Sequence, residues 1–290
     1  MLSLDPKSLA IPQLHAYLMG AVGPRPIAFA STIDKNGNSN LAPFSFFNVF
    51  SSNPPVLIFS PNRSGRTGET KHTHDNVLEV PEVVINVVTY NMVQQMSLAS
   101  SPYAKGTDEF IKSGFTKLPS VCVKPFRVAE SPVQLECKVT EVKEMGKTGG
   151  AGNLIFSEVQ MIHINEEVLG INNNIDQQKI DLVARMGGNW YCRANGNALF
   201  ELEKPITTLG IGVDMLPFEI RNSKILSGND LGMLGNLEVL PDEDLINNLK
   251  NHAENLSSEE EYHSDIKKLL SQNKVKEAWA IILNKKITNN

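Results

Sequence analysis

The sequence predicts a mainly β protein with helical insertions, arranged as an antiparallel barrel, followed by a C-terminal α-helical extension. Two observations support this prediction. Up to about residue 200, strand-length apolar runs are separated by turn signals, without the regular alternation of strands and helices found in doubly wound folds. From residue 241 onward the pattern is helical. A change in composition near residue 204 therefore divides the chain into a domain at 1–204 and an extension at 205–290.

The first predicted hairpin contains an unusual strand. Asn36-Gly37 is a strong turn signal between the β-rich segment 26–33 and a strand expected at 39–50. That second strand, NLAPFSFFNVF from residue 40, mixes aromatic and hydrogen-bonding side chains on both faces. An ordinary half-buried strand alternates apolar and polar residues. We therefore expect one part of it to fill the core, through Phe44 and Phe50, and another part to form the wall of a ligand site.

The other elements of the first 200 residues follow from similar signals. Glycine and proline clusters separate them, and a glycine-rich tip, GKTGGAG, joins the last two strands. We expect strands at 53–62, 82–90, 132–145 and 153–164, helices at 70–79, 91–100 and 176–186, and a long loop at 101–120.

The C-terminal extension has a different character. Residues 205–220 are predicted to be extended, and the glycine-bearing segment 227–236 is predicted to be a loop. Helices are expected from residue 241, with Asp242 and Ser257 or Ser258 as N-caps. We expect this extension to have a structural role, such as bracing a dimer or covering a site, rather than a catalytic one.

Composition excludes several classes of function. The net charge of −5 argues against binding to nucleic acid or to an anionic membrane, which requires an excess of clustered Lys and Arg. No apolar run approaches the ~18 residues of a membrane span. The N-terminus lacks the features of a signal peptide, so a cytoplasmic location is expected. The three cysteines are widely spaced, which predicts reduced structural thiols.

No group of side chains predicts catalysis by the protein itself. His72-Thr73-His74 lacks the carboxylates that would complete a metal site, and His163 at a strand end is expected to be structural. Neither a Ser-His-Asp nor a Cys-His arrangement is evident. We therefore expect no catalytic residue and no metal, and infer that a cofactor supplies the chemistry.

The polar segment 60–76 is the best candidate for holding such a cofactor. It combines hydroxyls and cations just before a predicted helix, and these groups, together with helix N–H groups, are what a phosphate requires. The alternative interpretation is a solvated polar loop. Together with the aromatic strand, the segment predicts a ligand that has a flat heteroaromatic ring and a phosphate tail, as FMN does.

Five motifs in order resemble one family. They are GPRPIAFASTIDKNGNSNLAPFSFFNVFSSNPPVLIFSP (23–61), DEFIKSGF (108–115), VKPFRVAESPVQLECKV (123–139), GNLIFSEVQMIHI (152–164) and VARMGGNWY (183–191). They are similar to the flavin reductase-like proteins with an FMN-binding split-barrel fold. The resemblance covers about residues 15–195.

This resemblance implies a split β-barrel that forms a homodimer, with FMN bound near each subunit interface. The residues implied along the flavin ring are Ala42, Ser45, Phe46, Phe47 and Asn48. Those implied at the phosphate are Ser60, Lys71, Thr73 and Asn76, with Arg63 and Arg66 as competing cations. The family often has Lys/Arg-Asp-Thr where this chain has Lys71-His72-Thr73. Arg185 and Tyr191, beside Trp190, are expected to reach the flavin or a nicotinamide pocket.

The reaction implied is hydride transfer from NAD(P)H to the flavin N5, with FMN as cofactor and FAD as an alternative substrate. Small molecules are then the substrates, and a monooxygenase that receives reduced flavin is a candidate partner. Two alternatives remain open. The protein could hold FMN tightly and reduce a ferric complex or an organic acceptor, or it could bind flavin without being an enzyme.

Overall fold

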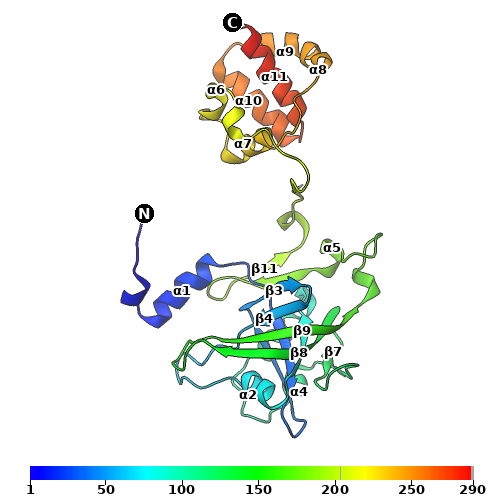
Figure 1. Cartoon of the computed structure of the whole chain (residues 1–290). Coiled ribbons are helices and arrows are strands. Elements are labelled where there is room, and N and C mark those ends of the chain that lie inside the picture. Colours follow the sequence, from blue (N-terminus) through cyan, green and yellow to red (C-terminus); the bar gives the residue numbers. More distant parts are fainter. Residues whose placement is uncertain (203, 289–290) are drawn as a thin grey trace. The chain divides into compact units, whose positions relative to one another are not determined.

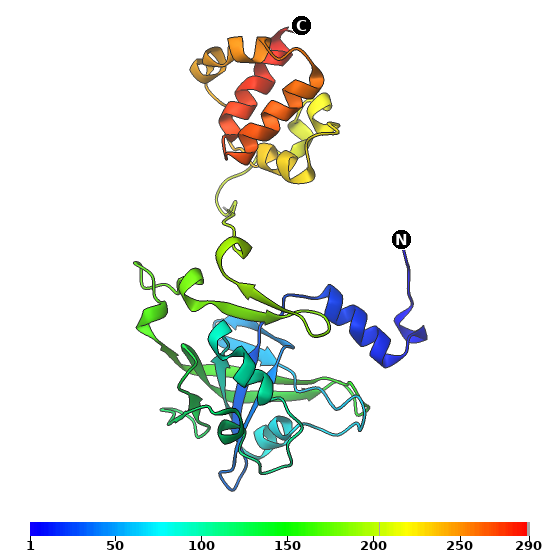
Figure 2. The same cartoon turned by 180° about the vertical axis from the view of Figure 1, so that it is seen from behind.

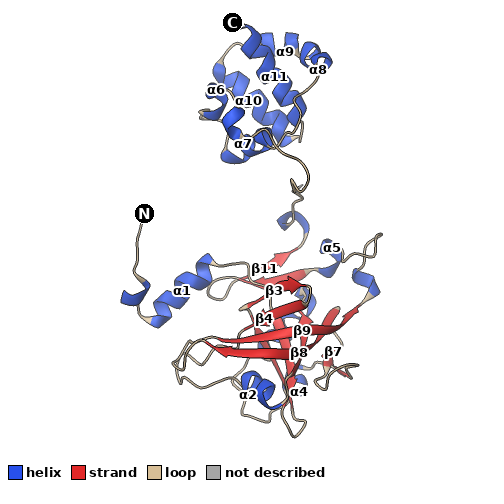
Figure 3. Ribbon diagram, in the orientation of Figure 1, coloured by secondary structure: helices blue, strands red, loops and turns tan. Residues whose placement is uncertain are grey.

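The computed structural model describes residues 1–202 and 204–288, with side chains up to residue 285. The chain forms two units, Met1–Phe200 and Glu201–Asn290. Strands are concentrated in the first unit and helices in the second (Figure 3). The predicted fold class, a mainly β domain with helical insertions followed by a helical extension, is confirmed. The last two residues of the predicted extension lie outside the described residues.

The first unit is built on a seven-stranded antiparallel sheet with the strand order β2-β1-β5-β8-β9-β4-β3. A separate hairpin, β10–β11, and a short pair, β6–β7, accompany it. The strands are β1 (Ala28–Ile33), β2 (Ser39–Phe44), β3 (Phe47–Ser52), β4 (Pro55–Phe59), β5 (Glu82–Val87), β6 (Lys117–Leu118), β7 (Arg127–Val128), β8 (Val133–Glu144), β9 (Asn153–Ile164), β10 (Leu182–Arg185) and β11 (Tyr191–Ala194).

The connection between β2 and β3 makes this sheet a barrel. These two strands are consecutive in the chain, yet they form opposite edges of the sheet. Only Ser45 and Phe46 lie between them, so their ends are at most about 11 Å apart. The sheet must therefore roll up until its edges meet. In Figures 1 and 2 the strands accordingly wrap around a common interior instead of lying in one flat layer.

The expected strand at 39–50 is wrong in one respect, because it is two strands. β2 ends at Phe44, the chain bends at Ser45-Phe46, and β3 starts at Phe47. The predicted hairpin turn is confirmed, with Gly37 in a left-handed conformation at φ 84°. The mixed faces of the segment reflect this corner, since the residues before and after it belong to strands at opposite sheet edges.

The helices of the first unit correct three predictions. They are α1 (Ile11–Ala21), α2 (His72–Glu79), α3 (Val93–Leu98), α4 (Glu109–Ser113) and α5 (Gln177–Ile180), with short 3-10 turns at Pro6–Ser8, Tyr90–Met92, Glu166–Val168 and Gly196–Ala198. The predicted loop 101–120 contains α4 and β6. The predicted helix 91–100 begins as a 3-10 turn, and that at 176–186 ends at Asp181, whose left-handed backbone leads into β10. Helix α1, which was not predicted, has no buried residue and extends away from the strands (Figures 1 and 2).

The second unit consists of helices connected by short turns. These are α6 (Phe218–Arg221), α7 (Gly228–Gly235), α8 (Glu243–Asn248), α9 (Lys250–Glu254), α10 (Glu259–Ser271) and α11 (Val275–Thr288), with a 3-10 turn at Val213–Met215. The predicted caps Asp242 and Ser258 are confirmed, because their side chains accept hydrogen bonds from Leu245 N and Glu261 N. None of the helices in the described part of the chain is long and apolar enough to cross a membrane.

Two predictions for this unit are wrong. The segment 227–236 is not a loop but contains α7, which starts with a capping box between Ser227 and Asp230. Residues 205–220 are not extended throughout, since they contain a 3-10 turn and most of α6. Glycines misled the prediction for 227–236, because the caps and the packing outweigh the low helix propensity of glycine.

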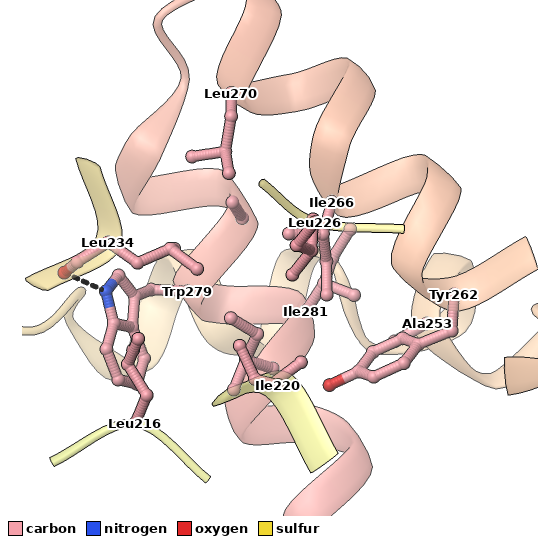
Figure 4. Packing of buried hydrophobic residues seen from close by; sticks show 12 residues of the cluster. Leu216, Ile220, Leu226, Leu234, Ala253, Tyr262, Ile266, Leu270, Trp279 and Ile281 are labelled. Carbon is pink, nitrogen blue, oxygen red and sulfur yellow. Dashed lines mark hydrogen bonds between the residues drawn. The ribbon is translucent and has the colours of Figure 1, made fainter. Parts of the chain in front are cut away.

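The second unit has its own hydrophobic core, shown in Figure 4. Trp279 of α11 is buried in this core and donates a hydrogen bond from Nε1 to the Leu234 carbonyl over 2.9 Å. Ile220, Ile266 and Ile281 belong to the same core and are fully buried. This core is distinct from the barrel clusters around Phe29 and Phe59, so the two units are stabilised by separate sets of apolar contacts.

The Gly210-Ile-Gly212 segment allows a close backbone approach in this unit. Ile211 N and Gly212 N donate to Leu237 O and Gly235 O. A Cβ on Gly210 would lie 2.5 Å from Gly235 O and 2.8 Å from Asn236 Cα, which are backbone atoms that cannot rotate away. Glycine is therefore needed here for packing.

We predict that Gly210→Ala destabilises the second unit by about 2 kcal/mol, because the added methyl forces two backbone segments apart. Gly232→Ala is the matched control, since a Cβ there meets no atom within 4 Å and replaces glycine within helix α7. That change should stabilise the unit by up to about 1 kcal/mol. Urea unfolding monitored by Trp279 fluorescence in a Trp190→Phe background measures both. Equal stability of the two variants would contradict the packing role of Gly210.

Candidate functional site

A cavity of about 590 Å³ lies beside the corner between β2 and β3. Ligand pockets in proteins typically have volumes of about 300–1,000 Å³. Four parts of the chain form its wall: β2 with the corner, the loop after β4 with the start of α2, the turn after α3, and Glu109 of α4. The lining residues are Asn40, Ala42, Pro43, Phe44, Ser45, Phe46, Ser60, Asn62, Ser64, Arg66, Thr67, Glu69, Thr70, Lys71, His72, Thr73, Ala99, Ser100, Ser101, Pro102, Tyr103 and Glu109.

The N-terminus of helix α2 opens onto this cavity. Lys71 is the N-cap residue and provides no side-chain cap for the first N–H groups of the helix. These N–H groups are the natural partners of an anion. Thr73 is buried, and its Oγ1 accepts a hydrogen bond from Asn40 Nδ2 over 2.9 Å. Because Asn40 is the donor in that bond, the proton of the Thr73 hydroxyl is available for an acceptor in the cavity.

Ser60 lines the cavity, but its hydroxyl already has partners. Its Oγ donates to Asn62 Oδ1 and accepts from Asn153 N, each over 2.8 Å. The β8–β9 hairpin tip also supports the loop that follows: Arg63 N donates to Ala151 O, and Gly150 N donates to Arg63 O. The hairpin tip therefore fixes the position of this loop through backbone hydrogen bonds.

The structure separates the two competing arginines. Arg66 is on the cavity wall and Arg63 is not. The Arg63 guanidinium pairs with Glu144 over 3.3 Å and donates to the Gly68 carbonyl. Arg66 and Lys71 are both exposed and are the cations of the cavity, so the geometry favours Arg66 over Arg63 as a phosphate ligand.

The aromatic stretch is divided between the cavity and other surroundings. Ala42, Ser45 and Phe46 line the cavity, and so does Phe44, which also packs on Phe59 with ring centroids 5.7 Å apart. Phe47 instead packs against the barrel core.

Beyond the corner, the residues of β3 face away from the cavity. Asn48 is exposed and does not line it. Phe50 is 65% exposed, so the expectation that it fills the core is wrong. The reason is the corner, which places Phe50 on an edge strand. The flavin contacts of the cavity-lining residues stay a prediction.

Three other predicted site residues lie outside this cavity. Asn76 is buried and donates to Thr32 Oγ1, which fastens α2 to β1. Arg185 stacks on Tyr191, with the guanidinium 4.5 Å from the ring centroid. Tyr191 lines a separate groove of about 220 Å³ on the β10–β11 hairpin. None of these three residues lines the 590 Å³ cavity.

Sequence reasoning missed Glu109. This carboxylate is only 5% exposed, lines the cavity, and accepts a hydrogen bond from Leu41 N over 3.1 Å. Burial raises the pKa of Glu109 above its usual value, and the neighbouring carboxylate of Asp108 adds to the effect. The DEFIKSGF motif signalled only the helix start, where Asp108 accepts a hydrogen bond from Phe110 N, and not the burial of Glu109.

His163 is structural, as expected. Its Nε2 lies 2.7 Å from Oε1 of the fully buried Glu136, which also accepts hydrogen bonds from Val121 N and Cys122 N. Burial by itself would raise the pKa of Glu136, but these hydrogen bonds lower it below its usual value. Within the described residues, no three His, Cys, Asp or Glu side chains are grouped to hold a metal ion.

The donor set of the cavity fits an FMN-type ligand. One wall offers helix N–H groups, the Thr73 hydroxyl and two cations, which suit a phosphate. The wall at the β2–β3 corner offers Phe44 and Phe46, which suit a flat ring. The side-chain oxygens of Asn40, Ser45 and Ser100 are available as acceptors for hydroxyls and ring edges. Asn40 Nδ2 and the Ser100 hydroxyl already donate within the protein.

Comparisons with known proteins identify the family. The model of the flavin reductase like domain matches residues 19–177. An uncharacterised protein of Halalkalibacterium halodurans is 34% identical over 206 residues, covering 70% of this chain and 97% of that protein. The crystal structure of nitrilotriacetate monooxygenase component B from Bacillus cereus superimposes with a TM-score of 0.65 at 26% identity, covering 70% of this chain and 98% of that one.

A second solved structure has a similar fold. A structure from Shewanella frigidimarina that is named for its split barrel domain has a TM-score of 0.58 at 23% identity, covering 69% of this chain and 96% of that one. The rolled sheet, open between β2 and β3, is a split barrel of this kind. The chain belongs to the flavin reductase like domain family.

Proposed function

We propose that this protein binds FMN in the 590 Å³ cavity and acts as an NAD(P)H-dependent flavin reductase. The single observation that supports this most is the pairing of two walls in one cavity. Lys71, Arg66 and the start of α2 form an anion-binding wall, and the β2–β3 corner forms an aromatic one. The family assignment supports a flavin as the ligand that has both features.

In this proposal the flavin supplies the hydride-accepting chemistry, and the protein supplies binding and orientation. The start of α2 and Thr73 hold the phosphate, and Lys71 and Arg66 neutralise its charge. Phe44 and Phe46 cover the ring and exclude water from one side of it. The absence of a catalytic triad among the predicted site residues agrees with a reaction that requires orientation more than acid–base catalysis.

We predict that Lys71→Gln and Arg66→Gln each weaken FMN binding by about tenfold, because each removes a charged partner of the phosphate. Riboflavin, which lacks the phosphate, should bind the variants and the wild type equally well. Quenching of flavin fluorescence measures both affinities. Lys124→Gln is the control, since this exposed lysine in the loop before β7 makes the same charge change away from the cavity wall. Equal losses for FMN and riboflavin would place the phosphate elsewhere.

The resemblance of this chain to a monooxygenase component supports a role in delivering reduced flavin to a second enzyme. We predict that oxidation of NADH or NADPH by the purified protein increases with added free FMN, because the flavin is then a substrate that leaves. Absorbance at 340 nm measures turnover. If turnover does not respond to free FMN, and one tightly bound FMN per chain is reduced, the protein instead passes electrons to another acceptor. If no absorbance above 400 nm remains after FMN titration and desalting, tight FMN binding is excluded.

We also propose that the protein is a homodimer whose interface includes strand β3 and helix α1. β3 is an edge strand with Val49 61% and Phe50 65% exposed. Helix α1 is apolar, has no buried residue, and brings His15 within 6.4 Å of the Phe46 ring. An exposed apolar edge strand is a surface that needs a partner, and a second copy would cover it.

We predict that Val49→Lys combined with Phe50→Lys yields a monomer, because two charges cannot be buried at this edge without partners. Sedimentation velocity over a range of micromolar concentrations measures the state of association. Val121→Lys is the control, since Val121 is 68% exposed on a loop away from β3. A monomeric wild type, or a double variant that stays dimeric, would contradict this interface.

A further inference from the structure

Glu109 is the unexplained group in the cavity wall. Buried carboxylates are rare unless they are paired or hydrogen-bonded. Glu109 uses Oε2 to accept a bond from Leu41 N, an N–H on the outer edge of β2. A carboxylate has acceptor capacity for several hydrogen bonds, so this edge contact does not exhaust it. The same side chain is part of the cavity wall.

The charged groups of the cavity lining come from two separate parts of the chain. Arg66, Lys71 and the positive end of α2 all belong to residues 60–73. Glu109 comes from a different element, α4, and lies against β2. The other carboxylate of the wall, Glu69, is exposed and accepts a bond from the Thr67 hydroxyl, so water screens its charge. Of the two carboxylates that line the cavity, Glu109 is therefore the one shielded from water.

We propose that Glu109 is a specificity residue that accepts a hydrogen bond from the ring or ribityl part of the flavin and repels the phosphate from its own part of the cavity. This inference rests on the proposed function. An anionic phosphate next to a buried carboxylate is repelled, whereas the N–H of a flavin ring or the hydroxyls of its chain are donors that a carboxylate binds well. The ligand class is thus a flavin with its anion at one end and its donors at the other.

Other titratable groups near Glu109 must be considered as sources of a pH dependence in ligand binding. On its own helix, Asp108 pairs with Lys117. The neighbouring elements β2 and α3 contain no titratable side chain. The other titratable groups of the cavity lining are Tyr103, His72, Lys71, Arg66 and Glu69. Any charge on His72 acts on an anionic phosphate much more than on uncharged riboflavin, so riboflavin is the ligand for the pH series.

The test uses the full-length protein and two ligands. Glu109→Gln keeps an oxygen that can accept from Leu41 N but removes the charge. We expect it to weaken FMN and riboflavin by the same factor, about tenfold, since a charged hydrogen bond is lost to the part that they share. Lys71→Gln should weaken FMN only. Glu130→Gln, which alters an exposed carboxylate that also accepts from a backbone N–H, is the matched control and should change neither.

Riboflavin affinity measured over a pH series is a second test. It would not depend on the protonation of Glu109 if this residue had only a structural role. Protonation removes the acceptor charge, so riboflavin affinity of the wild type should fall as the pH is lowered through the raised pKa of Glu109. The Glu109→Gln variant should show no such fall, and His72→Asn should retain it.

The outcomes are distinct. If Glu109→Gln binds FMN equally well or more tightly, the inference is wrong, and tighter binding would mean that the phosphate faces Glu109. If the wild type binds neither flavin at any pH, the proposed function itself fails. If the wild type binds both and only the variant loses affinity with unchanged thermal stability, the assignment of Glu109 holds.

Discussion

The two-residue connection between β2 and β3 is the constraint on which the barrel depends. Consecutive strands are normally neighbours in a sheet, but these two form its opposite edges. A sheet of seven strands can satisfy that arrangement only by curving until the edges approach each other. The edges then meet at Ser45-Phe46 without a ladder of hydrogen bonds between them, which leaves the barrel open on that side. The two-residue connection therefore causes both the curling of the sheet and the opening between β2 and β3.

The cavity lies at this opening for the same reason. β2 reaches the corner from one edge, and β4, the partner of β3, ends at Phe59 just before the polar loop. Ser60 N donates to Phe46 O over 2.9 Å, which fixes the start of the loop to the corner. An aromatic wall and an anion-binding wall, separate in the sequence, thereby become two sides of one site. The fold thus places the cavity where its own hydrogen bonding is incomplete.

Local signals in the sequence predicted the elements with clear endings. The Asn36-Gly37 turn, the long strands beside the glycine-rich tip, and the caps at Asp242 and Ser258 are all as expected, because each depends on neighbours in the chain. The corner at Ser45-Phe46 was not predictable from pattern, since tertiary closure decides it. Helix α7 was missed because its stability depends on the core around Trp279 rather than on propensity.

The site residues were likewise predictable where they depend on neighbours in the chain, and not where they depend on distant packing. Residues near the start of α2 were predicted from their chemistry, and Lys71 and Thr73 do line the cavity. Arg63 could not be ranked against Arg66, because its partner Glu144 is 81 residues away. Glu109 was missed because its burial follows from the packing of α4 on β2.

The β8–β9 hairpin tip, which hydrogen-bonds to the loop after β4, affects which substitutions could alter the cavity. A Cβ on Gly149 would lie 3.0 Å from Ser64 O, and one on Gly152 would lie 3.2 Å from Ser60 Oγ, so the hairpin tip and the loop fit together with no spare space. Backbone hydrogen bonds at Arg63 fasten the loop to this tip. Substitutions or length changes in the tip, remote in sequence and absent from the cavity wall, are therefore a route by which ligand affinity could be tuned while every lining side chain is kept.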